Sequence, residues 1–270
     1  MADIWSTVAT LDPASQEVLA AVLETRAAHP RQQEMRREFL SSVTFPASAR
    51  VLEVGCGTGA LTRTIAGWSD VGSVVGLDPA PSLLAKAREL STEYTNIFYR
   101  EGDGRALPFD DATFDVVVFD STLCHIPGPE VALAEAARIL RAEGLLAIFD
   151  GDYVTSTVAL SEHDPLQTCV SVLMSNVVND RYIVRRMPTL VREAGFEVIT
   201  AGSHGLVETS DQGYVMTIID RGADMLCASG VIGEALAAAL KAEARSRADS
   251  GCFFGHVSYG SLVARKPKMA

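Results

Sequence analysis

Short runs of consecutive apolar residues recur along the first half of the chain, and each run closes on an acid or is followed by a glycine. Three of these runs are Val51–Val54, Ser73–Asp78 and Phe114–Asp120. Such runs are typical of strands that are buried on both faces of a parallel sheet. Stretches with helical periodicity separate them, so the pattern predicts an α/β fold in which strands and helices alternate.

Two helices are predicted before the first strand. Asp12-Pro13 is a typical helix start, and the second helix is expected from Pro30 to about Leu40. Apolar residues recur at helical spacing in the first helix: Val18, Leu19, Val22 and Leu23. We expect the two helices to form a lid that precedes the core.

Helical insertions and two further strands are predicted after the fifth strand. Residues 156–180 carry an apolar helical stripe, which we expect to lie over the substrate side: Leu166, Val170, Leu173 and Met174. Beyond it the pattern predicts a helix at Pro188–Ala194, a strand at Phe196–Val207, helices at Tyr214–Leu226 and Gly233–Arg247, and a last strand at Phe253–Ala264.

The segment Val51–Ala60 reads as a strand that runs into a glycine-rich turn and then into a helix. Gly55 and Gly57 lack a Cβ, so the backbone can turn sharply and approach a ligand closely. Thr58 can help to open the helix, whose N-terminus offers free N–H groups and partial positive charge. Taken alone, this Gly-x-Gly-x-x-Gly/Ala pattern fits a nicotinamide dinucleotide as well as other nucleotide-like cofactors.

Acidic residues stand at the ends of the strands that follow. Asp78 comes roughly 20 residues after Gly55, where it is the natural partner of ribose hydroxyls. Asp103, flanked by glycines, is placed to accept a hydrogen bond from an adenine amino group, and Asp120 closes the next strand. These strand ends are therefore expected to meet at one crevice.

This series of motifs resembles the class I S-adenosylmethionine-dependent methyltransferases, and within them the small-molecule group related to ubiquinone and menaquinone biosynthesis. The resemblance covers residues 45–155. It implies that the turn at residues 53–59 wraps the methionine part of S-adenosylmethionine, that Asp78 holds both ribose hydroxyls and that Asp103 meets the adenine. The residues expected to bind this cofactor are Glu53, Gly55, Cys56, Gly57, Gly59, Asp78, Pro79, Asp103, Gly104 and Asp120.

The resemblance also implies the fold. We expect an α/β, Rossmann-like domain with a seven-stranded, mostly parallel sheet, an antiparallel last strand, helices on both faces, and a helical N-terminal lid and insertions. Ala132–Leu146 resembles the family's helix, turn and fifth strand, although Ala142-Glu143 stands where Pro-Gly is commoner. The expected divisions are the lid over 1–44, the core over 45–155, and helical cap insertions with strands six and seven over 156–270.

Methyl transfer from a sulfonium chiefly requires that the acceptor atom be held in line with the C–S bond, and a general base is optional. His125 is the first candidate base, because imidazole exchanges protons near neutral pH. Its alternative role is hydrogen bonding to the backbone. Asp152 and Tyr153 are candidates to face the substrate, and turn capping by Asp152 and packing of Tyr153 under the lid are the alternatives.

Side chains of the N-terminal helices are further candidates to close the site: Trp5, Arg36, Arg37 and Phe39. One of the two arginines could meet the carboxylate of the cofactor as a charge-assisted pair. Solvent-exposed positions on the helices are the favoured alternative for both arginines.

Composition narrows the partners and the compartment. The formal net charge of −11, with no basic cluster to offset it, disfavours nucleic acid and favours a small-molecule methyl acceptor. The five cysteines are scattered, no metal-ligand spacing is recognisable, and no run is typical of a signal peptide or a membrane span. We therefore expect a cytoplasmic protein without a metal, and an exposed apolar face on the N-terminal helices would favour a homodimer.

Two alternatives stay open. A nicotinamide-dependent oxidoreductase could use the same glycine turn, but no Tyr-x-x-x-Lys set accompanies it. The fold could also bind S-adenosylmethionine as a cyclase or as a non-catalytic module, because the donor site would look the same. The lid and insertions carry no motif that names an acceptor or that distinguishes O-, N- and C-methylation.

Overall fold

The computed structural model describes residues 5, 7–210 and 213–268. In this part of the chain, seven strands form one sheet in the order β3-β2-β1-β4-β5-β7-β6. β7 pairs antiparallel with β5 and with β6, whereas the other pairs are parallel. The strands are β1 (Ala49–Val54), β2 (Val71–Asp78), β3 (Ile97–Glu101), β4 (Phe114–Asp120), β5 (Leu140–Thr157), β6 (Glu197–Glu208) and β7 (Gly255–Arg265).

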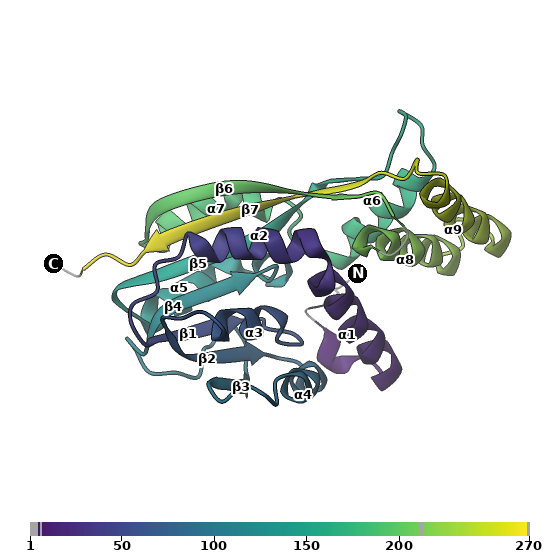
Figure 1. Ribbon diagram of the computed structural model, residues 1–270. Coiled ribbons are helices and arrows are strands. Elements are labelled where there is room, and N and C mark those ends of the chain that lie inside the picture. Colours follow the sequence, from purple (N-terminus) through teal and green to yellow (C-terminus); the bar gives the residue numbers. More distant parts are fainter. Residues whose placement is uncertain (1–4, 6, 211–212, 269–270) are drawn as a thin grey trace.

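Helices cover both faces of this sheet, as Figure 1 shows. α2 (Pro30–Ser41) and α3 (Ala60–Ala66) lie on the near face, and α5 (Pro129–Ile139) and α7 (Ile183–Glu193) lie on the far face. α4 (Pro81–Leu90) follows β2 and packs near β3. The predicted Rossmann-like α/β fold, with a mostly parallel sheet and an antiparallel last strand, is confirmed.

A second group of helices lies beyond one end of the sheet. β5, β6 and β7 are the longest strands, and they carry α6 (Leu166–Val177), α8 (Tyr214–Ala228) and α9 (Glu234–Asp249) at that end (Figure 1). α8 packs against α6 and α9, and it also contacts α1 (Pro13–Ala28) from the N-terminal region. We call α6, α8 and α9 the cap. The four predicted stripe residues of α6 are all buried.

Local signals explain why the N-terminal helices begin where predicted. The Asp12 carboxylate caps α1 by accepting from the Ser15 N–H at 3.1 Å, and Pro13 occupies the first helical turn. His29 caps α2 in the same way, with Pro30 following. The N-terminal part of the predicted lid, residues 1–4 and 6, lies outside the described residues.

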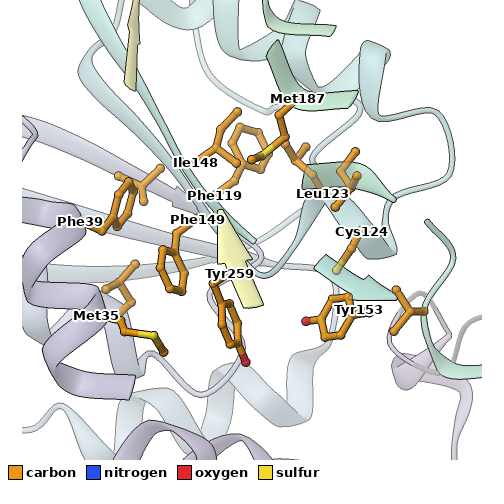
Figure 2. Packing of buried hydrophobic residues seen from close by; sticks show 14 of the residues in the cluster. Met35, Phe39, Phe119, Leu123, Cys124, Ile148, Phe149, Tyr153, Met187 and Tyr259 are labelled. Carbon is orange, nitrogen blue, oxygen red and sulfur yellow. The ribbon is translucent and has the colours of Figure 1, made fainter. Parts of the chain in front are cut away.

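An aromatic stack fastens α2 to the sheet beside the strand ends. Phe149 of β5 stacks on Tyr259 of β7, with ring centroids 5.1 Å apart, and Phe39 of α2 lies 5.5 Å from Phe149 on the other side. Figure 2 shows the three rings in a row with Met35 next to them. Such aromatic contacts add to simple burial of apolar area. They hold the second N-terminal helix in a fixed position.

Two boundaries differ from the expectation. α7 begins at Ile183, before Pro188, because its buried face of Ile183, Met187, Leu190 and Val191 continues on both sides of the proline and offsets the missing N–H bond. The turn expected at Ala142-Glu143 falls inside β5, where Glu143 takes a left-handed φ of 65°. No helix in the described part of the chain is long and apolar enough to cross a membrane.

Candidate active site

One pocket lies at the carboxyl ends of β1, β2 and β4, between the N-terminal helices and the cap. With the exception of Gly59, the residues predicted to bind cofactor or to act in catalysis all line it. They are Glu53, Gly55, Cys56, Gly57, Asp78, Pro79, Asp103, Gly104, Asp120, His125 and Tyr153. Ligands in open α/β sheets collect at this edge. β1 pairs in parallel with β2 and with β4, so the carboxyl ends of these strands lie at one edge of the sheet. Residues that are far apart in the sequence therefore meet here.

The glycine turn has no room for a side chain at Gly55 or at Gly59. Gly55 has a φ of 74°, and a Cβ there would lie 2.3 Å from Cγ2 of Thr122. Gly59 has a φ of 76°, caps α3, and would place a Cβ 2.2 Å from the hydroxyl oxygen of Tyr99. Gly59 therefore shapes the turn from behind, while Ala60, the first residue of α3, lines the pocket.

Asp78 ties the end of β2 to this turn. Its two carboxylate oxygens accept one N–H each, from Gly57 at 2.8 Å and from Ala80 at 2.9 Å. The side chain is buried, and this burial raises the pKa of Asp78 to about 6, against the opposing effect of the two backbone hydrogen bonds. Each oxygen keeps a lone pair that can accept a hydrogen bond from a ligand hydroxyl.

Glu53 is buried at the end of β1. It accepts a hydrogen bond from the Thr62 hydroxyl of α3. Burial is the main cause that raises the pKa of Glu53 to about 8. The ligand-free pocket thus holds a carboxyl group that keeps its proton at neutral pH. Burial likewise raises the pKa of the neighbouring Cys56 thiol well above its ordinary value, so the thiol is not an activated nucleophile.

This burial predicts that the protein becomes less stable as pH rises from about 5 to 8. Between its ordinary value of 4.5 and its folded value of about 8, Glu53 keeps a proton that the unfolded chain has lost. The free energy of unfolding then falls with rising pH. Glu53→Gln cannot ionise, so its melting temperature should fall by several degrees less over this range than that of the wild type.

Differential scanning fluorimetry of the ligand-free protein at successive pH values measures the effect. Glu101→Gln is the matched control, because Glu101 is an exposed carboxylate at the end of β3, a strand of the same sheet that does not pair with β1. The melting temperature of Glu101→Gln should change with pH as that of the wild type does. Ionisation of Asp78 contributes equally to the pH dependence of all three proteins. Parallel melting curves for the wild type and Glu53→Gln would contradict the assignment of a protonated Glu53.

Asp103 lines the pocket but is already engaged. Arg105 holds its carboxylate through Nε and a terminal nitrogen, the shortest contact being 2.7 Å, and both side chains are about half exposed. The Arg105 guanidinium keeps the pKa of Asp103 below its ordinary value. Its predicted bond to adenine stays a prediction, and it would have to use an oxygen lone pair that Arg105 leaves open.

Asp120 forms a buried ion pair with Arg36 of α2. Only 3% of the Asp120 side chain and 7% of the Arg36 side chain are exposed. The expectation of a solvent-exposed position is therefore wrong for Arg36, which lines the pocket, while Arg37 is exposed as expected. Helix α2 places Arg36 inward because Met35, Phe39 and Leu40 pack on the same side of the helix.

The two catalytic candidates line the pocket from the segment after β4 and from β5. His125 ends the short 3-10 helix Leu123–His125, and its ring lies 6.0 Å from that of Trp5. Tyr153 of β5 is buried, and burial raises the pKa of its phenol well above the ordinary value. Asp152 instead forms an ion pair with Arg185 at 3.0 Å and is not among the pocket residues.

Several pocket residues were not predicted from the sequence, among them Arg26, Tyr214 and Arg221. The Arg26 guanidinium lies 5.9 Å from the centroid of the Tyr214 ring. One signal was available for Arg26, because it follows Val22 and Leu23 at helical spacing and therefore shares their inward face. Nothing comparable marks Arg221, whose placement depends on how α8 packs against α1 and α6.

Comparison with known proteins agrees with this geometry. Residues 52–148 match a family model described as a methyltransferase domain. The 2-phytyl-1,4-naphtoquinone methyltransferase of Thermosynechococcus vestitus is 40% identical over 107 residues, covering 39% of this chain and 48% of the relative. A demethylmenaquinone methyltransferase of Tropheryma whipplei is 34% identical over 124 residues, covering 46% and 51%. The chain thus spans about half the length of the curated relatives it matches.

Solved structures share the fold. The [4+2]-cyclase SpnF superposes with a TM-score of 0.64 at 19% identity, covering 99% of this chain and 98% of that one. A phosphoethanolamine N-methyltransferase of Haemonchus contortus, in complex with S-adenosyl-L-methionine, has a TM-score of 0.52 at 17% identity and covers 87% and 53%. Residues 52–148 therefore form a methyltransferase domain, and the chain resembles the class I S-adenosylmethionine-dependent methyltransferases, the quinone methyltransferases in particular.

Proposed function

We propose that the protein transfers the methyl group of S-adenosylmethionine to a nucleophilic atom of a small molecule. The observation that carries the proposal is a single pocket that joins the glycine turn and the strand-end acids to His125, Tyr153 and the cap. A donor bound at the turn and an acceptor bound under the cap would share one enclosed space. The methyltransferase domain at residues 52–148 supports the same reaction type.

The residues present suit this cofactor. The free lone pairs on both oxygens of Asp78 match a pair of neighbouring ribose hydroxyls. Gly55 and Gly57, both with a positive φ, line the pocket with backbone alone, which a ligand can approach closely. Glu53, which keeps its proton in the ligand-free pocket, can ionise to meet a ligand that brings positive charge.

When bound, S-adenosylmethionine supplies a methyl group that is already activated on a sulfonium, so positioning of the acceptor contributes most of the rate. The cap residues Met174, Val177 and Val178 line the pocket and exclude water from it. Tyr153 keeps its proton at physiological pH and can donate a hydrogen bond that orients an acceptor oxygen. His125 can take a proton from an acceptor that must lose one.

A small acceptor fits the enclosed pocket and the net charge of −11 better than a nucleic acid does. The resemblance to a demethylmenaquinone methyltransferase and a 2-phytyl-1,4-naphtoquinone methyltransferase makes hydroquinones and naphthols the first acceptors to test. A homodimer gains no support from the described part of the N-terminal helices, because Val18 is their single large exposed hydrophobic residue.

Isothermal titration calorimetry with S-adenosylmethionine, S-adenosylhomocysteine and NADH tests the cofactor. Mass spectrometry of reactions with phenols, hydroquinones, amines and thiols then detects a product heavier by one methylene unit. Binding of both S-adenosyl ligands together with a methylated product would support the proposal. Binding of NADH alone would replace it with an oxidoreductase. Conversion of a polyene substrate without methyl transfer would favour a cyclase.

His125→Ala should reduce turnover about 100-fold or more while the Kd for S-adenosylmethionine changes less than about threefold, if His125 serves as the base. The imidazole lines the pocket from the segment after β4, whereas Asp78, the expected ribose partner, ends β2. Steady-state kinetics and calorimetry on the same preparation measure the two effects separately. His163→Ala, an exposed histidine outside the pocket, is the control. Unchanged turnover would remove His125 from the mechanism.

A further inference from the structure

Arg26 is a buried cation that forms no ion pair with any carboxylate among the described residues. Its side chain lines the pocket, and the residue is only 9% exposed. Within the described ranges, no oxygen atom accepts a hydrogen bond from its guanidinium, and Nε is buried without a partner. Its guanidinium lies over the ring of Tyr214, 5.9 Å from the ring centroid. Burying a charge in this way is unfavourable unless a ligand completes the site.

The acids of the pocket are already committed to other groups. Asp120 pairs with Arg36, and Asp78 accepts hydrogen bonds from two backbone N–H groups. Glu53 bonds to the Thr62 hydroxyl, and its raised pKa leaves it neutral near pH 7. The guanidinium of Arg26 therefore has no carboxylate of its own among these acids.

A second arginine approaches the same place from the cap. Arg221 of α8 lines the pocket, and its guanidinium forms no ion pair or hydrogen bond with the described residues. Burial lowers the pKa of Arg221, and Tyr214 acts on it in the opposite direction. α1, which carries Arg26, contacts α8, which carries both Tyr214 and Arg221, so the two arginines line the pocket from the lid and from the cap.

The pocket that the two arginines line has apolar and aromatic walls. Tyr153 and Tyr214 contribute rings, and Met174, Val177 and Val178 contribute apolar surface. A fully charged, strongly hydrated ligand would leave this surface uncovered. An apolar or aromatic body that ends in one anionic group would satisfy both the walls and the arginines.

We propose that Arg26 and Arg221 bind a carboxylate of the methyl acceptor, and that the acceptor is accordingly a small aromatic or apolar carboxylic acid. This inference rests on the proposed function. Arginine is suited to the task because its planar fork binds carboxylates through paired hydrogen bonds. The anion would also offset the positive charge that a sulfonium brings into the same pocket.

The carboxylate of the cofactor is the competing ligand for Arg26. The groups that act electrostatically on Arg26 are Tyr259, Tyr153, Asp120 and Tyr214. The three tyrosines belong to β7, β5 and α8, outside the strands that carry the glycine turn and Asp78. Asp120, at the end of β4 next to β1, forms its ion pair with Arg36 and not with Arg26. We therefore assign Arg26 to the acceptor, and the affinity for S-adenosylhomocysteine tests this assignment.

Binding of matched acids and amides tests the inference without any turnover. 4-Hydroxybenzoate, 4-hydroxyphenylacetate and 1-hydroxy-2-naphthoate, each beside its primary amide, are titrated by calorimetry into protein saturated with S-adenosylhomocysteine. At least one acid should bind about 10-fold to 100-fold more tightly than its amide. If no acid binds more tightly than its amide, the inference is wrong, whatever the methylation assays show.

Two variants locate the effect. Arg26→Met and Arg221→Met should each remove most of the preference for the acid, while Arg37→Met, on the exposed side of α2, should keep it. Arg26→Met should also melt at the same temperature as the wild type or higher, because it replaces an unpaired buried charge with an apolar chain. A purely structural arginine would instead lower the melting temperature.

The affinity for S-adenosylhomocysteine separates the two carboxylate sources. Arg26→Met should leave its Kd within about twofold of the wild type, since the cofactor's carboxylate would then be held elsewhere. A loss of about tenfold or more would assign Arg26 to the cofactor and overturn the inference. Retention of the acid preference in Arg26→Met and in Arg221→Met would overturn it as well.

Discussion

Asp78→Asn should weaken S-adenosylmethionine binding by about 100-fold or more. The two oxygens of Asp78 each accept a backbone N–H, from Gly57 and from Ala80, so an amide nitrogen at either position faces a donor instead of an acceptor. The substitution also removes one charge-assisted bond to the ribose, and such bonds contribute roughly 1.5–3 kcal/mol each. Loss of the ribose bond and distortion of the glycine turn act in the same direction. Isothermal titration calorimetry measures the change in Kd.

Glu101→Gln provides the control for this variant. Glu101 pairs with Asp78 in the register of β2 and β3, but it is exposed and does not line the pocket. Its Kd should stay within about twofold of the wild type. A folded Asp78→Asn protein with an unchanged Kd would show that the ribose is held by other groups.

Asp120→Asn should lower stability more than any surface substitution in this chain. It leaves the buried guanidinium of Arg36 without its counter-charge, and removing one partner of a buried ion pair typically costs about 3–5 kcal/mol. For a domain of this size the melting temperature should fall by roughly 10 °C. Thermal denaturation followed by circular dichroism measures the change.

The exposed pair of Arg31 and Glu34 on the same helix gives the matched comparison. Its nitrogen and oxygen lie 2.7 Å apart, but 58% of the Glu34 side chain is exposed, so Glu34→Gln should shift the melting temperature by only about 1–2 °C. Replacing both buried partners, as Arg36→Met with Asp120→Leu, should recover much of the stability lost in Asp120→Asn. Equal melting temperatures for the buried and exposed single variants would contradict the role of the buried pair.

The parallel half of the fold could be predicted because burial on both sheet faces leaves continuous apolar runs, and those runs end where the pocket begins. Asp78 and Asp120 therefore could be placed at one edge from their positions in the chain alone. The starts of the two N-terminal helices could be predicted as well. Asp12 is a typical N-cap residue, and Pro30 is typical of the first helical position. The roles of the predicted site residues in binding and catalysis remain predictions.

Side chains that reach the pocket from the lid and cap were harder to foresee. Arg36 reads as a surface residue in a polar helix, and its inward position depends on the aromatic stack that fixes α2 on β5 and β7. Arg221 depends on helix packing between distant segments, which no local pattern encodes. Pro188 was expected to start a helix, but tertiary packing of α7 extended the helix in front of it.

The two insertions that build the cap leave the sheet at a shared end. One follows β5 and the other follows β6, and β7 returns the chain between them (Figure 1). Lengthening, shortening or exchanging either insertion changes none of the strand pairing beneath it. Evolution can thus diversify what the enzyme modifies while the donor half stays untouched, and engineers can graft alternative caps at the same junctions.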